Sequence, residues 1–432
     1  MKVIILDIEN IYEKERVLIA GIYFDKEEIG INNSMDELQE LVEEAGGEVV
    51  LRVIQKKDRI DSAFFVGRGK VEEIRNYCED LKIDTVAFND ELSGAQIKNL
   101  EDAIERKVID RTNLILDIFA RRAATKEGKL QVKLAQLQYM LPRLIGMRDY
   151  LSREGGGIGT RGPGEQKLET DRRHVLREIT NIEKQLKSIE KIREVKRKKR
   201  LASNLPIVAL VGYTNAGKST LLNKILEISG ESSVKDVFAY DMLFATLDVS
   251  YRRAKLPKGQ YFLITDTVGF INKLPVKLVE AFKGTLEEIK YADLLLHVVD
   301  VSNRDVDIQI KTTYNILKEM GVIDKPIITV LNKIDKVDIY NTYYDQNIVK
   351  EKVFISAEKK INLGILMDTI EKMIPQKFFY VALKIPYDKQ NLLSNICENY
   401  NTENLKYEED GVYLNVSLNS IDFERYKEYI LF

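Results

Sequence analysis

Residues 212–219 read GYTNAGKS and match the pattern G-x-x-x-x-G-K-[ST]. A continuously apolar segment, residues 207–211, comes before them, and a helical run, residues 220–228, follows. A loop of this type joins a buried strand to the N-terminus of a helix, where glycines let main-chain N–H groups surround phosphates. The pattern therefore predicts a parallel sheet covered by helices, with a phosphate site at one edge of that sheet.

Three further motifs follow this loop, each at the end of an apolar segment. D-T-V-G begins at Asp266, N-K-I-D ends at Asp335, and Ser356 follows the strand-like residues 353–355. The carboxyl ends of parallel strands meet at one edge of a sheet, so these motifs are expected to surround the same phosphate site. The Asp335 carboxylate can accept hydrogen bonds from N1–H and the 2-amino group of guanine, and adenine presents neither donor there. The set predicts a site that selects GTP over ATP.

The predicted nucleotide contacts come from the glycine loop, from a segment before the second motif that should close over the nucleotide, and from the later motifs. They are Gly212, Tyr213, Thr214, Asn215, Ala216, Gly217, Lys218, Ser219, Thr220, Phe244, Ala245, Thr246, Leu247, Asp248, Asp266, Thr267, Val268, Gly269, Asn332, Lys333, Ile334, Asp335, Ser356, Ala357 and Glu358. Mg²⁺ is expected on Ser219, Thr246 and Asp266, the last through water. Lys218, Thr246 and Gly269 are the predicted catalytic residues, with Lys218 reaching the β- and γ-phosphates.

Phe270 follows Gly269, at the position where Ras-type GTPases carry a glutamine that orients the attacking water. A phenyl ring cannot orient water, so hydrolysis by the chain alone is predicted to be slow and to need another group. Asn215 in the glycine loop suggests one such group. In some GTPases with a hydrophobic residue in place of the glutamine, an asparagine at this position coordinates a K⁺ ion that replaces an arginine finger. Dependence on K⁺ is therefore a hypothesis.

Charge is distributed unevenly along the 432 residues. Lys and Arg number 66 and Asp and Glu number 68, a net charge of −2, which excludes a uniformly basic protein. Residues 121–200 alone hold 22 basic and 10 acidic residues, so they carry +12 and the remaining 352 residues carry −14. This division predicts one segment that meets a polyanion, on an otherwise acidic body.

Two stretches of this basic segment share a 4-3-4-3 spacing of apolar residues, which is the seam of two helices packed together. The seam residues are Leu130, Leu134, Leu137, Leu141 and Leu144 in the first stretch, and Val175, Ile179, Ile182, Leu186 and Ile189 in the second. We expect a helical hairpin on the order of 30 Å long at 1.5 Å per residue. Pro142 is expected to kink its first helix.

The remaining segments also indicate folded domains. Strand-like residues 17–24, 49–54 and 84–89 alternate with helix-like residues 35–46 and 95–106. The last segment reads as a strand, a helix, two strands and a final helix.

The predicted fold class is α/β. An α/β N-terminal domain (residues 1–128) precedes a basic helical hairpin with a glycine-rich tip loop (129–200). A P-loop GTPase domain with a mostly parallel sheet (201–375) and a small α+β C-terminal domain (376–432) follow.

Composition excludes several other classes of protein. The two cysteines, Cys78 and Cys397, form no disulfide framework, and two histidines leave little for a zinc site. Asp7 and Glu9 interrupt the N-terminal apolar run too early for a signal peptide, and no apolar stretch approaches the ~18 residues of a membrane span. We expect a monomeric cytoplasmic protein without membrane insertion; peripheral association with a membrane stays open.

Several segments resemble the HflX family of translational GTPases. Residues 155–165 (GGGIGTRGPGE) are similar to its signature loop, residues 269–288 to its switch II and following helix, and residues 65–70 and 110–119 to its N-terminal domain. The similarity spans about residues 60–370. Gln166-Lys167 and Asn272-Lys273 depart from the commoner Thr-Gln and Arg-Asp pairs, and neither pair touches the nucleotide.

The resemblance implies a ribosome-stimulated GTPase that binds the 50S subunit through its rRNA. It would place the hairpin loop near the peptidyl-transferase region and help to dissociate stalled or idle ribosomes. Six glycines within residues 155–164 let the backbone approach RNA phosphates closely. The predicted RNA contacts are Arg153, Gly155, Gly156, Gly157, Arg161 and Lys167.

Other interpretations remain open at this point. The hairpin loop could be a flexible hinge whose charges are only solvated. The chain could be a ribosome-assembly or RNA-modification GTPase, or a nucleotide-gated adaptor for a protein partner. In some members of the family the N-terminal domain binds or hydrolyses ATP. Residues 65–70 (FVGRGK) could hold an ATP phosphate, although a plain strand-to-helix turn explains them better, because the full loop spacing and a following Ser or Thr are missing.

Overall fold

The computed structural model describes residues 14–24, 28–154, 163–202, 205–230, 251–257, 259–267, 269–270, 287–303, 305–337, 349–374 and 378–431. The chain divides into two compact units. The described residues up to Leu186 form the first unit, and the described residues from Lys187 onward form the second.

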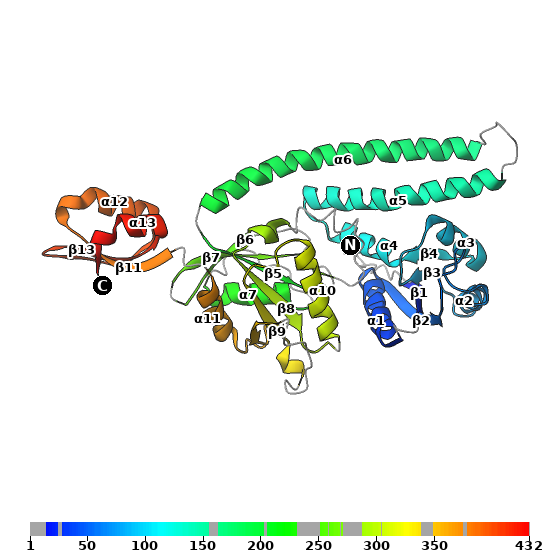
Figure 1. The fold of residues 1–432 in the computed structure, drawn as a ribbon, viewed down its shortest axis with the longest axis horizontal. Coiled ribbons are helices and arrows are strands. Elements are labelled where there is room, and N and C mark those ends of the chain that lie inside the picture. Colours follow the sequence, from blue (N-terminus) through cyan, green and yellow to red (C-terminus); the bar gives the residue numbers. More distant parts are fainter. Residues whose placement is uncertain are drawn as a thin grey trace, which may run out of the picture. The chain divides into compact units, whose positions relative to one another are not determined.

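A parallel sheet in the order β2-β1-β3-β4 forms the core of the first unit (Figure 1). Its elements are β1 (Glu15–Tyr23), α1 (Glu28–Glu44), β2 (Gly47–Lys56), α2 (Arg68–Asp80), β3 (Thr85–Phe88), α3 (Gly94–Ile104), β4 (Lys107–Asp110) and α4 (Arg111–Arg122). Leu18, Ala20 and Ile22 of β1 pack in one cluster with buried residues of α2 and α3, while α1 contacts α4. The predicted strands and helices of this domain are confirmed. Sequence reasoning did not identify β4, whose four residues are too few for a recognisable alternation.

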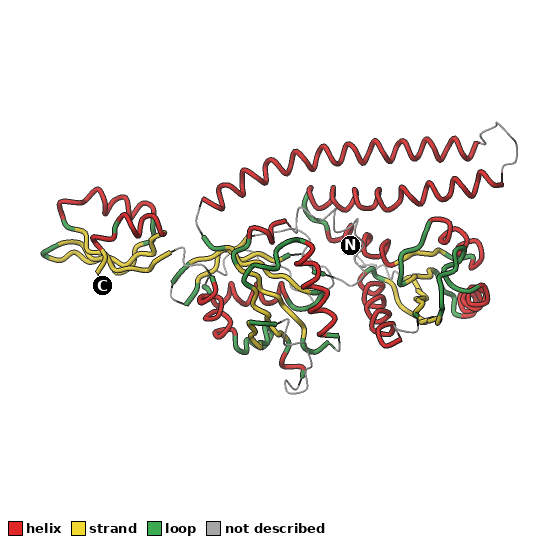
Figure 2. The backbone as a smooth tube through the Cα atoms, viewed as in Figure 1, coloured by secondary structure: helices red, strands yellow, loops and turns green. Residues whose placement is uncertain are grey.

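Two long helices form the predicted hairpin: α5 (Lys126–Glu154) and α6 (Pro163–Ala202) (Figure 2). The seam is confirmed, because Leu134 and Leu137 of α5 are buried in one cluster with Val175, Ile179 and Ile182 of α6. The predicted length of 30 Å was wrong. The helices have 29 and 40 residues, or about 44 Å and 60 Å at 1.5 Å per residue. Helix α5 runs without interruption through Pro142.

The second unit contains a six-stranded sheet in the order β10-β9-β8-β5-β7-β6, in which only β6 runs antiparallel to its neighbour. Its elements are β5 (Ile207–Gly212), α7 (Lys218–Ile228), β6 (Tyr251–Lys255), β7 (Tyr261–Asp266), η1 (Glu288–Tyr291), β8 (Leu294–Asp300), α10 (Val306–Glu319), β9 (Ile327–Asn332), η2 (Ile334–Lys336), β10 (Glu351–Phe354) and α11 (Leu363–Met373). Helices α7 and α11 share one apolar cluster with the strands, and α10 packs in a second. The mostly parallel sheet is confirmed. The edge strand β6 (YRRAK) was not predicted, because it lacks an apolar run.

A small antiparallel sheet in the order β12-β13-β11-β14 ends the chain. Its elements are β11 (Phe378–Ile385), η4 (Tyr387–Lys389), α12 (Gln390–Asn399), β12 (Thr402–Glu408), β13 (Gly411–Asn419), α13 (Ser420–Arg425), η5 (Lys427–Tyr429) and β14 (Ile430–Leu431). Alternate residues of β11 and β13 share an apolar cluster with Ile396 of α12 and Tyr426. This agrees with the predicted α+β segment. The two-residue strand β14 was not predicted.

Within the described ranges, none of the helices is both long and apolar enough to span a bilayer. The same ranges contain no group of three or more His, Cys, Asp or Glu residues that could hold a metal ion.

Candidate nucleotide-binding site

The glycine loop joins β5 to α7, as predicted, and two of its glycines are required by close backbone approaches. Gly212 has φ +145°, and a Cβ there would lie 2.2 Å from the carbonyl oxygen of Val298. Gly217 has φ +90°, and a Cβ there would lie 2.4 Å from Nδ2 of Asn332. Both positions combine a left-handed backbone with contact to a neighbouring strand, so only glycine fits. The sheet therefore determines the shape of the loop.

Main-chain hydrogen bonds connect this loop to Phe270, the residue that follows the D-T-V-G motif. The N–H of Thr214 donates to the carbonyl oxygen of Phe270 at 2.8 Å, and the N–H of Phe270 donates to the carbonyl oxygen of Gly212 at 3.0 Å. A Cβ at Gly269 would lie 2.8 Å from Cγ2 of Thr214 and 3.0 Å from Nζ of Lys218. The first and second motifs thus lie side by side, as predicted, and the Phe270 side chain is buried.

Lys218 begins α7 and is buried beneath the loop that it belongs to. Its Nζ donates to the carbonyl oxygens of Tyr213 at 2.7 Å and Gly212 at 3.1 Å. Burial lowers the pKa of this ammonium group to about 8, and the nearby Asp266 carboxylate offsets part of that effect. A buried cation whose hydrogen bonds to the described residues go to main-chain carbonyl oxygens is well placed to gain energy from a phosphate.

Ser219 and Asp266 are two of the three residues that were predicted to hold Mg²⁺. The Ser219 hydroxyl donates to Oδ2 of Asp266 at 2.6 Å, and Oδ1 of Asp266 accepts from the main-chain N–H of Thr267 at 2.9 Å. The Thr267 hydroxyl in turn donates to the carbonyl oxygen of Leu210 at 2.7 Å. A hydroxyl and a carboxylate supply the oxygen ligands that Mg²⁺ prefers, so these residues fit that ion.

Asn332 connects the N-K-I-D motif to two other parts of the site. Its buried Nδ2 donates to the carbonyl oxygen of Ala216 at 2.9 Å, and its Oδ1 accepts from the N–H of Ala357 at 3.0 Å. Lys333, whose φ is +65°, forms an ion pair with Asp300 at 2.8 Å. One amide side chain thus joins the glycine loop, the N-K-I-D motif and the residues after β10.

Asp335 lies exposed at the same edge of the sheet. A hydrogen bond from the buried Ser356 hydroxyl holds the pKa of the Asp335 carboxyl below its ordinary value, so the group is a carboxylate at neutral pH. An exposed acceptor oriented by a buried hydroxyl suits the two donors on the edge of guanine. The N-K-I-D motif and Ser356-Ala357 are therefore brought together as predicted.

Several predicted residues lie outside the described ranges. They are Phe244, Ala245, Thr246, Leu247, Asp248, Val268, Gly155, Gly156, Gly157 and Arg161. Arg153 belongs to α5 and Lys167 to α6, where only the helical backbone is described. The proposed RNA contacts therefore stay predictions.

His297 is a neighbour of the site that sequence reasoning missed. It lies buried on β8, and its ring stands edge-on to Tyr314 with ring centres 5.5 Å apart. Burial, with a smaller contribution from the charge of Lys218, lowers the pKa of His297 to about 3. A neutral imidazole here adds no second positive charge beside the phosphate-binding lysine. The sequence feature that could have drawn attention to His297 is its place inside an apolar run, residues 294–299.

Three family models match consecutive parts of the chain. The model described as "GTP-binding GTPase N-terminal" matches residues 32–120, and "GTP-binding GTPase Middle Region" matches residues 122–200. The model described as "50S ribosome-binding GTPase" matches residues 207–333, which include the glycine loop and the start of the N-K-I-D motif.

Curated relatives match over nearly the whole length of the chain. "GTPase HflX" of Caldanaerobacter subterraneus subsp. tengcongensis is 46% identical over 419 residues, covering 97% of this chain and 94% of the relative. "GTPase HflX" of Escherichia coli K12 is 39% identical over 417 residues, covering 95% of each chain. A similar solved structure is that of a GTP-binding protein from the archaeon Sulfolobus solfataricus in complex with GDP. It is 26% identical, covers 82% of this chain and 98% of that one, and has a TM-score of 0.43. The extent of the matches to the curated relatives, together with the assembled motifs, shows that the chain belongs to the GTPase HflX family.

Proposed function

We propose that this chain is a GTP-hydrolysing translation factor that binds the 50S ribosomal subunit and helps to dissociate stalled or idle ribosomes. The observation that carries the proposal is the arrangement of Lys218, Ser219, Asp266, Asn332 and Asp335 at one edge of a single sheet. All of these residues except Asp335 lie within residues 207–333, which match a family model described as a 50S ribosome-binding GTPase. The chain also carries the +12 segment that would meet rRNA.

Each residue of the site has a defined task in this proposal. Lys218 would leave the two carbonyl oxygens that it contacts and bind the β- and γ-phosphates. Main-chain N–H groups of the loop would bind phosphate oxygens at the N-terminus of α7. Ser219 and Asp266 would hold Mg²⁺, which neutralises charge on the phosphates when bound. Asp335 would bind guanine.

Hydrolysis needs a group that orders water, and Phe270 is not that group. Its side chain is buried and its main chain is engaged by the glycine loop. We therefore expect slow hydrolysis by the chain alone and faster hydrolysis on the ribosome. Thr246 and the segment after Gly269 are the parts that GTP would order and GDP would release.

GTP hydrolysis measured with and without 50S subunits tests this function. We expect at least about a tenfold higher rate with 50S subunits, since completion of a GTPase site by a partner typically gives larger factors than this. In a second arm, the chain loaded with a non-hydrolysable GTP analogue is sedimented with ribosomes. It should co-sediment with 50S subunits and convert 70S ribosomes to subunits. Unchanged hydrolysis together with no co-sedimentation would reject the proposal.

K⁺ is a proposed second cofactor because of the position of Asn215. This half-buried residue has φ +58° in the middle of the glycine loop. We expect faster GTP hydrolysis in KCl than in NaCl at equal ionic strength, and an Asn215→Ala variant that no longer distinguishes the two salts. Equal rates of the unaltered chain in both salts would remove K⁺ from the mechanism.

We also propose that the first unit hydrolyses ATP, which would require the turn before α2 to hold a phosphate. The N–H of Gly67 donates to Oε1 of Gln55 at 2.9 Å, and Lys70 forms an ion pair with Glu73 at 2.7 Å. ATP would have to displace both contacts. If ATP is a substrate there, Lys70→Ala should abolish ATP hydrolysis and preserve GTP hydrolysis; an unchanged ATPase rate would exclude the turn.

A further inference from the structure

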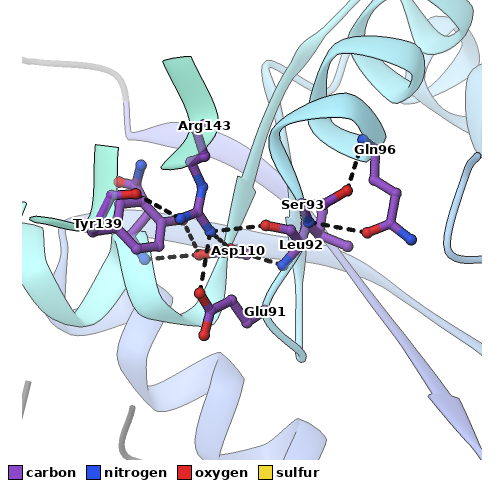
Figure 3. Close-up of polar contacts among 8 residues, drawn as sticks. Glu91, Leu92, Ser93, Gln96, Asp110, Tyr139 and Arg143 are labelled. Carbon is purple, nitrogen blue, oxygen red and sulfur yellow. Dashed lines mark hydrogen bonds and ion pairs between the residues drawn. The ribbon is translucent and has the colours of Figure 1, made fainter. Parts of the chain in front are cut away.

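A buried polar cluster joins α5 to the parallel sheet of the first unit (Figure 3). Its centre is Asp110, which is fully buried at the carboxyl end of β4. Oδ1 of Asp110 accepts from the N–H of Asn113 at 2.9 Å and from the hydroxyl of Tyr139. Oδ2 accepts from the N–H of Leu92 at 3.0 Å and from Nη2 of Arg143 at 2.8 Å. One carboxylate thus binds a loop of the sheet, the start of α4 and two residues of α5.

Arg143 adds further contacts between α5 and the loop at Leu92. Its Nη2 also donates to the carbonyl oxygen of Leu92 at 2.8 Å, and its Nη1 donates to the carbonyl oxygen of Tyr139 at 2.8 Å. The guanidinium carbon lies 3.3 Å from the centre of the Tyr139 ring. At Gly94 a Cβ would lie 2.8 Å from the main chain of Arg143, so the start of α3 touches the backbone of α5. We call Asp110, Tyr139 and Arg143 the α5 clamp.

The clamp holds α5 at the weakest point of that helix. Pro142 lies in the helix interior with its side chain exposed, and the two clamp residues of α5 flank it, Tyr139 before it and Arg143 after it. A proline has no N–H, so the carbonyl oxygen of Gln138 loses its usual helical donor and the helix bends more easily there. The 12 residues that follow Pro142, up to Glu154, extend about 18 Å at 1.5 Å per residue. A rotation of about 10° at Pro142 would therefore move the end of α5 by about 3 Å.

We propose that the α5 clamp fixes the direction of the hairpin at its proline hinge, and that Asp110, Tyr139 and Arg143 are positioning residues for the contact between the hairpin tip and the 50S subunit. This rests on the proposed function. Four hydrogen bonds to one buried carboxylate are costly to break singly, because each loss leaves a buried group unsatisfied. The clamp belongs to the first compact unit and the nucleotide-binding residues to the second. Loosening the clamp should therefore change ribosome-stimulated hydrolysis and leave basal hydrolysis unchanged.

A titration of GTP hydrolysis with 50S subunits tests the clamp. Tyr139→Phe removes only the hydroxyl. Arg143→Lys keeps the charge but loses the planar fork, whose Nη1 contacts the Tyr139 carbonyl oxygen while Nη2 contacts Asp110 and Leu92. We expect both variants to need roughly tenfold more 50S subunits for half-maximal stimulation, with basal and plateau rates unchanged. Arg177→Lys, at an exposed arginine of α6, is the matched control and should behave like the unaltered chain. Clamp variants with an unaltered titration curve would overturn the proposal.

A second measurement tests the clamp without ribosomes, so that its outcome is separate from that of the proposed function. Spin labels at Glu72→Cys on α2 and Thr170→Cys on α6 report the direction of the hairpin, in a Cys397→Ser background where Cys78 is buried. Tyr139→Phe should broaden the distance distribution. Adding Pro142→Ala, which restores the helical hydrogen bond, should narrow it again. A distribution that Tyr139→Phe leaves unchanged, or a broadening that Pro142→Ala leaves in place, would overturn the clamp even if 50S stimulation is observed.

Discussion

Lys218 shows how a single residue of the site is prepared for its ligand. The ammonium group is buried and contacts carbonyl dipoles, which neutralise no charge. Burial therefore depresses its pKa to about 8. A bound phosphate favours the charged form and would raise this pKa again. Binding of a nucleotide and protonation of Lys218 are consequently linked.

This linkage predicts how nucleotide affinity depends on pH. Below pH 8 Lys218 is already charged and the affinity for GDP should be constant. Above pH 8 binding must take up a proton, so affinity should fall by up to about tenfold per pH unit until the pKa of the bound state is reached. Calorimetric titration with GDP between about pH 7 and pH 9 measures this. Lys218→Met should bind weakly at every pH, and an unaltered chain with constant affinity up to pH 9 would contradict the linkage.

If Asp335 binds the base, substituting it should change which base the site prefers. Asp335→Asn replaces two acceptor oxygens with one acceptor and one donor, which suits the 2-oxo group of xanthine better than the 2-amino group of guanine. Hydrogen bonds to a charged group contribute about 1.5–3 kcal/mol each, so losing two should weaken GDP binding by about 100-fold or more. Xanthosine diphosphate should then bind more tightly than GDP. Competition against a fluorescent GDP analogue measures both, and retained GDP preference would remove Asp335 from base recognition.

Single residues were predictable where the chemistry is local in sequence. The glycine loop, Asp266, Asn332 and Asp335 follow strand ends, and a strand end is visible in a sequence as the end of an apolar run. The bridging role of Asn332 was not predictable, because its partners Ala216 and Ala357 are joined to it only by the order of strands in the sheet. The α5 clamp was hidden for the same reason.

At the scale of elements, the packing of α5 on α6 has a measurable energetic consequence. Ile182 is buried at the centre of the seam, and Ile182→Ala should destabilise the helix pair by about 2–5 kcal/mol. Hydrogen exchange should become faster in both helices and stay unchanged in β5 and α7. Glu183→Ala, at the exposed neighbouring position, serves as the control. Protection that is lost in α6 alone would mean that the seam does not couple the two helices.

The lengths of elements were harder to predict than their existence. The apolar seam ends near residue 189, whereas α6 continues to Ala202 through mostly charged residues. Such residues are good helix formers with no seam to reveal them. Strands of two to five residues, such as β4, β6 and β14, were missed because their length or polarity gives no periodic signal.

For the whole molecule, the separation of a +12 segment from a −14 remainder predicts a strong dependence of ribosome binding on salt. The logarithm of the 50S binding constant should fall linearly with the logarithm of the salt concentration, because phosphate contacts release counterions. Changing Arg153, Arg161 and Lys167 together to glutamine should reduce that slope by about two to three. Co-sedimentation over a range of KCl concentrations measures the slope. An unaltered slope in the triple variant would place the RNA contact elsewhere on the chain.

The protein contacts that hold the glycine loop affect how the protein exchanges GDP for GTP. The loop is held by the Asn332 amide and by the Phe270 main chain, all of them protein atoms. Its shape therefore persists while one nucleotide departs and the next arrives. We expect GDP to dissociate and GTP to replace it without an exchange factor, so that the cellular ratio of the two nucleotides sets how much of the protein is ready for a ribosome.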